Sequence, residues 1–209
     1  MIACVLPKAG VGHTFPLAFP ELDDHRLAAC LYANLGSFVL DYLARQKIGG
    51  THVTYGLLKQ FPVIAPDAYD DPAPWFVTEI SGSWILSRVL ELTFTAWDLA
   101  PFARDCGYDG PPLLWNDARR FLLRCELDAA FFHLYGVNRD DTSYIMETFP
   151  VVKKKDIQQH GDYRTKLTIL EIYDDMQRAM ETSEPYQTRL DPPPANPRVA
   201  HSPIGDDRS

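Results

Sequence analysis

Apolar residues recur at intervals of three and four positions from His25 to about Arg45, and this spacing predicts a helix with one buried face. The residues of that face are Leu27, Cys30, Leu31, Leu35, Phe38, Val39 and Tyr42. Asp23 or Asp24 is suited to cap the start of the helix, and Gly49 with Gly50 ends it. Gly36 weakens the helix interior, so we expect a close packing contact there.

The segments on either side of this helix are short. Residues 2–22 alternate brief apolar runs with Gly and Pro, which predicts one or two short strands. After the two glycines, Thr51 or Thr54 can cap a short helix from about Tyr55 to Gln60. Pro62 and Pro66 then favour an extended exit.

From Trp75 onward the pattern is almost wholly helical. Helices are predicted over about 84–106 with a break at Pro101, over a segment that starts at Asn116 or Asp117 and ends before Gly136, over about 140–148, and over about 163–181. We therefore predict an α+β fold, in which a small mixed α/β lobe precedes a mainly helical lobe.

The proline-rich stretches suggest the limits of these lobes. We expect a first lobe over residues 1–66, a polar linker over 67–74 and a helical lobe over 75–182. Residues 183–209 are polar and rich in Pro, and we expect a disordered tail there.

Composition and charge narrow the function classes. With 46% hydrophobic residues among 209, the chain can bury a substantial core. No run of eighteen apolar residues and no signal-peptide pattern is present, so we expect a cytoplasmic protein without a membrane span. The net charge is −8, and the first lobe, the second lobe and the tail are each negative. Because DNA affinity depends on cations that replace counterions, the chain alone should bind DNA weakly, through a local basic patch or within a larger assembly.

Catalytic motifs are absent from the sequence. There is no G-x-G-x-x-G, no phosphate-binding loop, no G-x-S-x-G and no H-E-x-x-H. An Asn/Asp-Pro-Pro-Tyr/Phe turn is approximated only by Asp191–Pro194, in the expected tail. Six scattered histidines and four distant cysteines indicate no catalytic or metal site, and each cysteine is expected to be a small buried group. We predict no catalytic residues, no metal and no cofactor in this chain.

The turn after the first helix is the strongest candidate for a binding site. It gathers cations, bare backbone and small polar groups, and it is expected to contact double-stranded DNA by phosphate and base-edge contacts. The candidate residues are Arg45, Lys47, Gly49, Gly50, Thr51, His52, Thr54, Tyr55 and Lys59. The alternative is an ordinary helix-stop turn with a solvated basic edge.

Longer phrases of the sequence resemble a known family. The stretch ANLGSFVLDYLARQKIGGTHVTYGLLKQFPVI is similar to the target-recognition region of type IIG/IIL restriction–modification enzymes, which methylate adenine N6, and similar in plan to type I specificity subunits. The motifs L-D-A-x-x-x-H-L-Y-G, Y-I-x-x-T-F-P and G-x-Y-R-T-K resemble the C-terminal segment of the same enzymes. The resemblance covers roughly residues 1–182.

This resemblance implies a DNA specificity module of a restriction–modification or phage-defence system. The catalytic domain of those enzymes has no counterpart here, so S-adenosylmethionine is expected on a methyltransferase or restriction partner, or on a parent domain. Three interpretations stay open: a specificity module, a protein-interaction module that docks on a catalytic partner, and a nonfunctional truncated remnant.

Several other polar residues have simpler interpretations. For Lys153–Lys155 a solvated linker between helices is favoured over a phosphate contact. Arg119, Arg120 and Arg124 are expected to form ion pairs on a helix surface, with Glu126 or Asp128 as partners. Asn34 and Ser37 are expected to pack or cap helices, and Tyr135 and Tyr144 to lie in the core.

Overall fold

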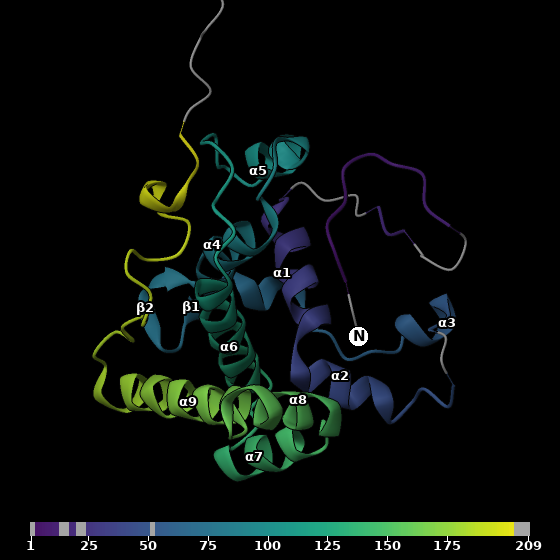
Figure 1. The fold of residues 1–209 in the computed structure, drawn as a ribbon, viewed down its shortest axis with the longest axis vertical. Coiled ribbons are helices and arrows are strands. Elements are labelled where there is room, and N and C mark those ends of the chain that lie inside the picture. The colour runs from purple at the N-terminus through teal and green to yellow at the C-terminus, as the bar shows by residue number, and fades with distance from the viewer. Residues whose placement is uncertain (1–2, 13–16, 20–23, 51–52, 203–209) are drawn as a thin grey trace, which may run out of the picture.

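A computed structural model describes residues 3–12, 17–19, 24–50 and 53–202. The fold of these residues is mostly helical, with one small antiparallel hairpin (Figure 1). The helices are α1 (Arg26–Gly36), α2 (Phe38–Arg45), α3 (Tyr55–Leu58), α4 (Ser81–Thr93), α5 (Ala100–Asp105), α6 (Asp117–Leu134), α7 (Arg139–Glu147), α8 (Pro150–His160) and α9 (Arg164–Thr182). The strands are β1 (Pro72–Ala73) and β2 (Phe76–Ile80), and short 3-10 turns cover Pro66–Tyr69, Trp97–Leu99 and Pro197–Val199. The α+β class is confirmed at this level, with a minor sheet.

The core surrounds α6, which runs through the middle of the molecule (Figure 1). Helix α4 packs between α1 and α6, and α9 packs across α6 near its C-terminal end. One continuous cluster of buried side chains joins α1 and α2 to α4, α6 and α9. Residues from both expected lobes therefore share a single core.

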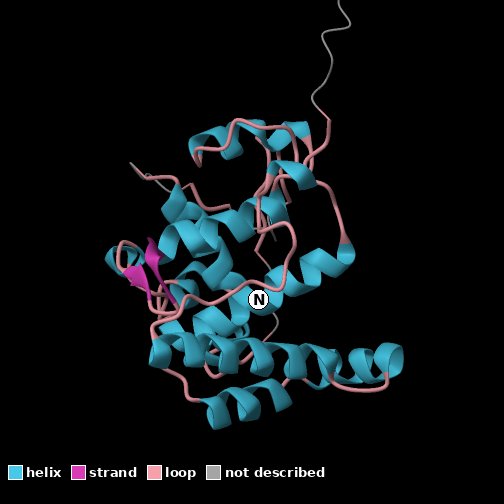
Figure 2. Cartoon of the chain, turned by 90° about the vertical axis from the view of Figure 1, so that its left-hand side faces the viewer, coloured by secondary structure: helices cyan, strands magenta, loops and turns pink. Residues whose placement is uncertain are grey.

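The segment 67–74, expected to be a linker, is part of that core. Tyr69 and Ala73 are buried, and Trp75 packs edge-on against Trp84 with ring centroids 5.1 Å apart. The strands also lie here, at 72–80, whereas the described residues of 3–12 and 17–19 contain no strand. The expected strands at 2–22 are therefore not found in the described residues. Figure 2 shows how small the hairpin is beside the helices.

The first predicted helix is two helices, α1 and α2, which meet at a bend of 60°. Ser37 is extended at this point (φ −72°, ψ 148°), and its hydroxyl accepts the Leu40 N–H and donates to the Asn34 carbonyl. The Phe38 N–H donates to the carboxylate of Asp128, 2.8 Å away. Ser37 thus caps a new helix, as its expected capping role implied. A Cβ at Gly36 would meet nothing within 4 Å, so the close contact expected there is absent.

Most helix ends in the second half follow local signals. Asn116 caps α6 by accepting the Arg119 N–H, and Gly136 follows its end with φ of 65°. The helix expected over about 84–106 ends earlier than the break expected at Pro101: α4 stops at Thr93, and Pro101 lies in the first turn of α5. Tyr144 is 63% exposed on α7, so the core position expected for it is wrong, whereas Tyr135 packs partly buried against the core.

Residues 183–202 are packed against the helices, which corrects the expected disordered tail over this range. Tyr186 and Leu190 are buried, and the Tyr186 hydroxyl donates to Glu126. Ala200 forms an antiparallel bridge with Leu113. The end of the expected tail, 203–209, lies outside the described residues.

No single helix in the described ranges is long and apolar enough to cross a membrane, although the bent pair of α1 and α2 together reaches that length and composition.

Candidate nucleic-acid interface

The candidate residues lie on residues 45–59, which we call the glycine-turn segment. It begins at Arg45, the last residue of α2, and ends at Lys59, which follows α3. The Lys47 and Ile48 N–H groups both donate to the Ala44 carbonyl, so the chain leaves α2 in one further turn. Figure 1 shows α3 on the side of the molecule away from the hairpin. Thr51 and His52 lie outside the described residues.

Apolar and polar anchors hold the glycine-turn segment to the body of the protein. Ile48, Val53 and Leu58 pack against a small cluster formed by Leu40, Ala44 and Phe61. The exit from the segment is fixed by Asn34. Its side-chain oxygen accepts the Ile64 N–H, and its amide donates to the Tyr135 hydroxyl, which in turn donates to the Pro62 carbonyl. The packing role expected for Asn34 is therefore confirmed.

The outer side of the segment is polar and open. Lys47, Gly49, Gly50, Thr54 and Lys59 are exposed, and Tyr55 is 59% exposed. A Cβ at Gly49 or Gly50 would meet nothing within 4 Å, so no neighbour in the fold requires glycine there. Within the described ranges, neither lysine has an ion-pair partner. The segment therefore offers two free cations beside bare backbone.

Arg45 and Thr54 are already engaged within the protein. The Arg45 guanidinium pairs with Asp41 at 2.8 Å and lies over the ring of Phe149, 4.6 Å from its centroid. Burial by itself would raise the pKa of Asp41, but several interactions that include the hydrogen bond and the charge of Arg45 together outweigh it, and the pKa of Asp41 is lowered. Thr54 caps α3 by accepting the Leu57 N–H. DNA contact by these two side chains requires sharing or breaking these bonds.

Buried charges elsewhere stabilise the fold. Arg88 on α4 pairs with Glu126 on α6 at 2.8 Å, stacks over Trp84 and donates to the Trp84 carbonyl. Burial lowers the pKa of Arg88, and Glu126 opposes this shift. Glu126 also accepts from Tyr186 and Thr188, so the pair fastens residues 183–190 to the core.

The three arginines of α6 have partners other than those expected. Arg119 pairs with Glu91 at 2.6 Å, and Glu91 also accepts the Ala195 N–H. Arg120 donates to the Leu92 carbonyl and lies over Trp115, 3.5 Å from the ring centroid. Arg124 donates to the Arg120 carbonyl. The sequence did not show the partners Glu91 and Leu92, because both lie on α4, about 28 residues away along the chain.

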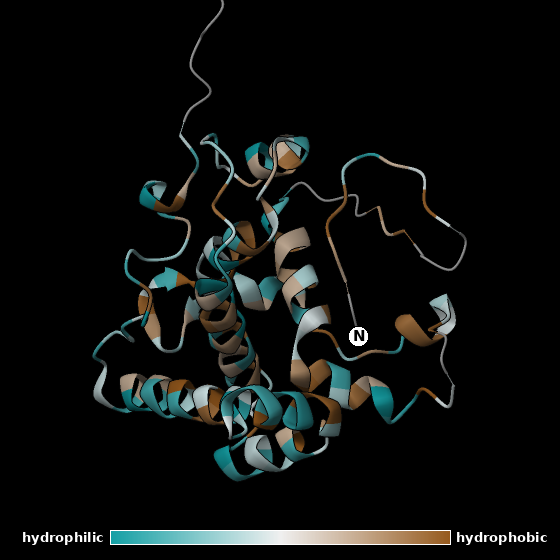
Figure 3. Cartoon of the chain, in the orientation of Figure 1, coloured by the Kyte–Doolittle hydropathy of each residue, from teal (hydrophilic) through white to brown (hydrophobic). Residues whose placement is uncertain are grey.

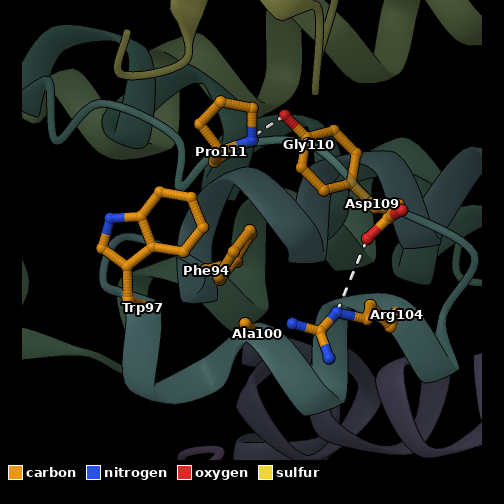
Figure 4. A pocket seen from close by; sticks show the side chains of 8 residues that line it. Phe94, Trp97, Ala100, Arg104, Asp109, Gly110 and Pro111 are labelled. Atoms are coloured by element: carbon orange, nitrogen blue, oxygen red, sulfur yellow. Dashed lines mark hydrogen bonds and ion pairs between the residues drawn. The ribbon is translucent and has the colours of Figure 1, made fainter. Parts of the chain in front are cut away.

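A separate open pocket of about 500 Å³ lies between α5 and the loop after it (Figure 4). Phe94 packs edge-on against Tyr108 with ring centroids 5.8 Å apart, and Arg104 pairs loosely with Asp109 at 3.5 Å. The Tyr108 hydroxyl donates to the Pro111 carbonyl. A Cβ at Gly110 would lie 2.6 Å from the Tyr108 hydroxyl oxygen, so a larger residue there would displace the Tyr108 side chain.

No three or more His, Cys, Asp or Glu side chains within the described part of the chain are placed to hold a metal ion. His133 stacks on Tyr173, with ring centroids 3.8 Å apart, and burial lowers the pKa of His133. Cys30 and Cys125 are buried as expected, Cys106 is partly buried, and Cys4 is exposed, which contradicts the expectation for that residue.

Comparison with protein-family models, with curated proteins and with solved structures found no match to this chain.

Proposed function

We propose that this chain is the DNA target-recognition module of a restriction–modification or phage-defence system that methylates adenine N6. The observation that carries the proposal is the open side of the glycine-turn segment, where Lys47 and Lys59 flank two exposed glycines. The ordered motifs that resemble such enzymes add the methyltransferase context. The small target-recognition lobe of that resemblance corresponds to α1, α2, α3 and the segments between them.

In this proposal the segment contacts one side of a DNA duplex. Lys47 and Lys59 neutralise phosphates, and the backbone at Gly49 and Gly50 approaches the DNA without steric hindrance from side chains. Tyr55, exposed beside them, supplies a planar surface and a hydroxyl group. Anchoring by the cluster around Leu40 and by Asn34 fixes the position of these groups before DNA binds.

The catalytic steps belong to another polypeptide or domain in this proposal. That partner binds S-adenosylmethionine and transfers the methyl group in the cytoplasm, and it supplies most of the phosphate contacts. A chain with a net charge of −8 and two free lysines at its interface binds DNA weakly by itself. The module then adds base selection to an assembly whose affinity comes largely from elsewhere.

A second candidate is a protein-interaction module that docks on such a catalytic partner. It is favoured by the adjacent exposed side chains of Leu114 and Trp115, which are 42% and 62% exposed just before α6. Exposed Trp side chains are frequent energetic centres of protein interfaces. The two candidates differ in what the lysines of the glycine-turn segment do.

The test measures binding of the purified chain to a pool of random-sequence DNA duplexes at several salt concentrations. The double variant Lys47→Glu with Lys59→Glu should bind DNA with an affinity at least tenfold lower. The slope of its affinity against salt concentration should fall by the equivalent of about two phosphate contacts. The matched control is Arg178→Glu with Arg198→Glu, which makes the same charge change at exposed residues elsewhere. Indifference to the lysine changes would favour the protein-interaction module. Methyl transfer from S-adenosylmethionine by the chain alone would overturn the assignment of catalysis to a partner.

A further inference from the structure

None of the eleven residues of helix α8 is buried. Figure 3 shows that much of this helix is hydrophilic. Contacts at the two ends of α8 and along its inner side attach it to the rest of the protein. Phe149, at its N-terminus, is buried against Phe38 with ring centroids 4.7 Å apart, and Gly161 ends it in the left-handed conformation. Asp156 accepts the Thr165 N–H at the start of α9. A polar helix anchored in this way leaves its outer face free.

The outer face of α8 carries side chains suited to base edges. Val152 and Asp156 lie toward the protein, so the opposite side of the helix is centred on Lys154 and includes Val151 and Gln158. All three outer residues are exposed, Val151 to 79%. This face therefore offers a cation, an amide and a methyl-bearing side chain in one row.

The charge of this helix is opposite to that of the whole chain. Lys153 pairs with Glu147 at 2.7 Å, whereas Lys154 and Lys155 have no ion-pair partner in the described ranges. Two free cations on one exposed helix in a protein of net charge −8 form a local positive surface. Such a surface is complementary to the phosphates of nucleic acid.

We propose that α8 enters the major groove of duplex DNA and reads base edges. The inference rests on the proposed function and extends it to a second element. Gln158 donates to adenine N7 and accepts from adenine N6, Val151 contacts a thymine methyl group, and Lys154 contacts a phosphate or a guanine edge. Lys155, on the flank of the helix, contacts the phosphate backbone. Lys153–Lys155, expected to lie in a linker between helices, are part of α8. In this proposal that helix faces DNA.

The location of α8 relative to the glycine-turn segment supports one continuous interface. Arg45 starts that segment and lies over the ring of Phe149, which immediately precedes α8. Lys153 lies one helical turn after Phe149, and its N–H donates to the Phe149 carbonyl. Phe38, the first residue of α2, also packs against Phe149. A duplex that contacts Lys47 therefore passes close to the N-terminal end of α8.

The dimensions of α8 fit the groove. An α-helix with side chains is about 10–12 Å wide, and the major groove is about 12 Å wide. Eleven residues span about 16 Å at 1.5 Å per residue. Base pairs follow one another at about 3.4 Å, so the exposed face of α8 covers four or five base pairs.

The test selects preferred sequences from a random duplex pool with the full chain, and then compares single variants on the selected duplex. Gln158→Ala should reduce discrimination at one A·T position by about 5- to 100-fold. Lys154→Ala with Lys155→Ala should lower the slope of affinity against salt concentration by the equivalent of one to two phosphate contacts. Gln187→Ala, an exposed glutamine outside α8, is the control for loss of an amide. Alanine favours helix, so circular dichroism should confirm that the α8 variants fold normally.

The outcomes separate this inference from the proposed function. If Lys47→Glu with Lys59→Glu weakens binding while every α8 variant keeps its affinity, salt dependence and base preference, α8 is not a reading helix and the proposed function stands. If the wild-type chain shows no salt-dependent binding to any duplex, both proposals fail. Loss of base preference at one position in Gln158→Ala, with Gln187→Ala unchanged, supports the assignment of α8.

Discussion

Arg88 and Glu126 form an ion pair in the centre of the protein, with 2.8 Å between Arg88 Nε and Glu126 Oε2 and side chains that are 5% and 0% exposed. The pair joins α4 to α6. Because Glu126 also accepts from Tyr186 and Thr188, it connects the helical core to the polypeptide that follows α9. Burying a charge this far from water costs free energy, and only a paired opposite charge offsets that cost.

Glu126→Gln should therefore be strongly destabilising. The change leaves the buried Arg88 charge without its ion-pair partner, and removal of one member of a buried pair typically costs about 3–5 kcal/mol. Urea unfolding at neutral pH measures the loss. The control is Asp174→Asn, which breaks the exposed pair with Arg139 and should cost less than about 1 kcal/mol. Equal losses of stability in the two variants would show that the buried pair contributes no more to stability than the exposed pair.

Tyr186→Phe should loosen residues 183–202. The hydroxyl donates to a buried carboxylate at 2.9 Å, and a hydrogen bond to a charged group contributes about 1.5–3 kcal/mol. We expect lower stability and faster amide exchange in this segment. Tyr144→Phe removes an exposed hydroxyl and should change stability by less than about 0.5 kcal/mol. Unaltered exchange after Tyr186→Phe would show that the segment is held by packing alone.

Asp128 should contribute to the pH dependence of the free energy of unfolding. Burial raises the pKa of this carboxyl from 3.8 to about 7, although the Phe38 N–H and Arg124 oppose the shift. In the unfolded chain the carboxyl ionises near its ordinary pKa. The stabilising effect of a neutral Asp128 is therefore fully present below about pH 4 and is lost as the pH rises through about 7.

Asp128→Asn removes this titration, since the amide oxygen can still accept the Phe38 N–H. Relative to wild type, the variant should gain about 4 kcal/mol of stability between pH 4 and pH 8, because each pKa unit corresponds to about 1.4 kcal/mol. Denaturant unfolding across that range measures the gain. Asp174→Asn, at an exposed site, should not reproduce it. A difference from wild type that stays constant with pH would contradict the prediction.

Ser37→Ala should destabilise the protein by about 1 kcal/mol, within the usual range of about 0.5–2 kcal/mol for loss of an N-cap. Ser37 is buried, and its hydroxyl bonds both the end of α1 and the start of α2. Thr54→Ala is the matched change in α3, a four-residue helix with no buried residue. It should speed amide exchange in α3 without altering global unfolding. Global losses of equal size would contradict this distinction.

The sequence by itself determined the elements whose signals are local. Asn116 and Gly136 marked the ends of α6, Pro150 marked the limit of α7, and apolar spacing located α9. These features depend on side chains that bond or pack within a few residues of one another. The glycine turn after α2 was likewise identified from composition alone, together with the exposed Lys47 and Lys59.

The tertiary structure decided what depends on distant partners. The bend at Ser37 involves Asp128, 90 residues from Phe38, and the order of the segment after α9 depends on Glu126, 60 residues from Tyr186. Neither partner is apparent from local pattern, because a polar, proline-rich stretch has the same composition whether it is solvated or bonded to a buried carboxylate. The outward face of α8 was decided in the same way, since only the packing of Phe149 and Asp156 shows which side of the lysine run is free.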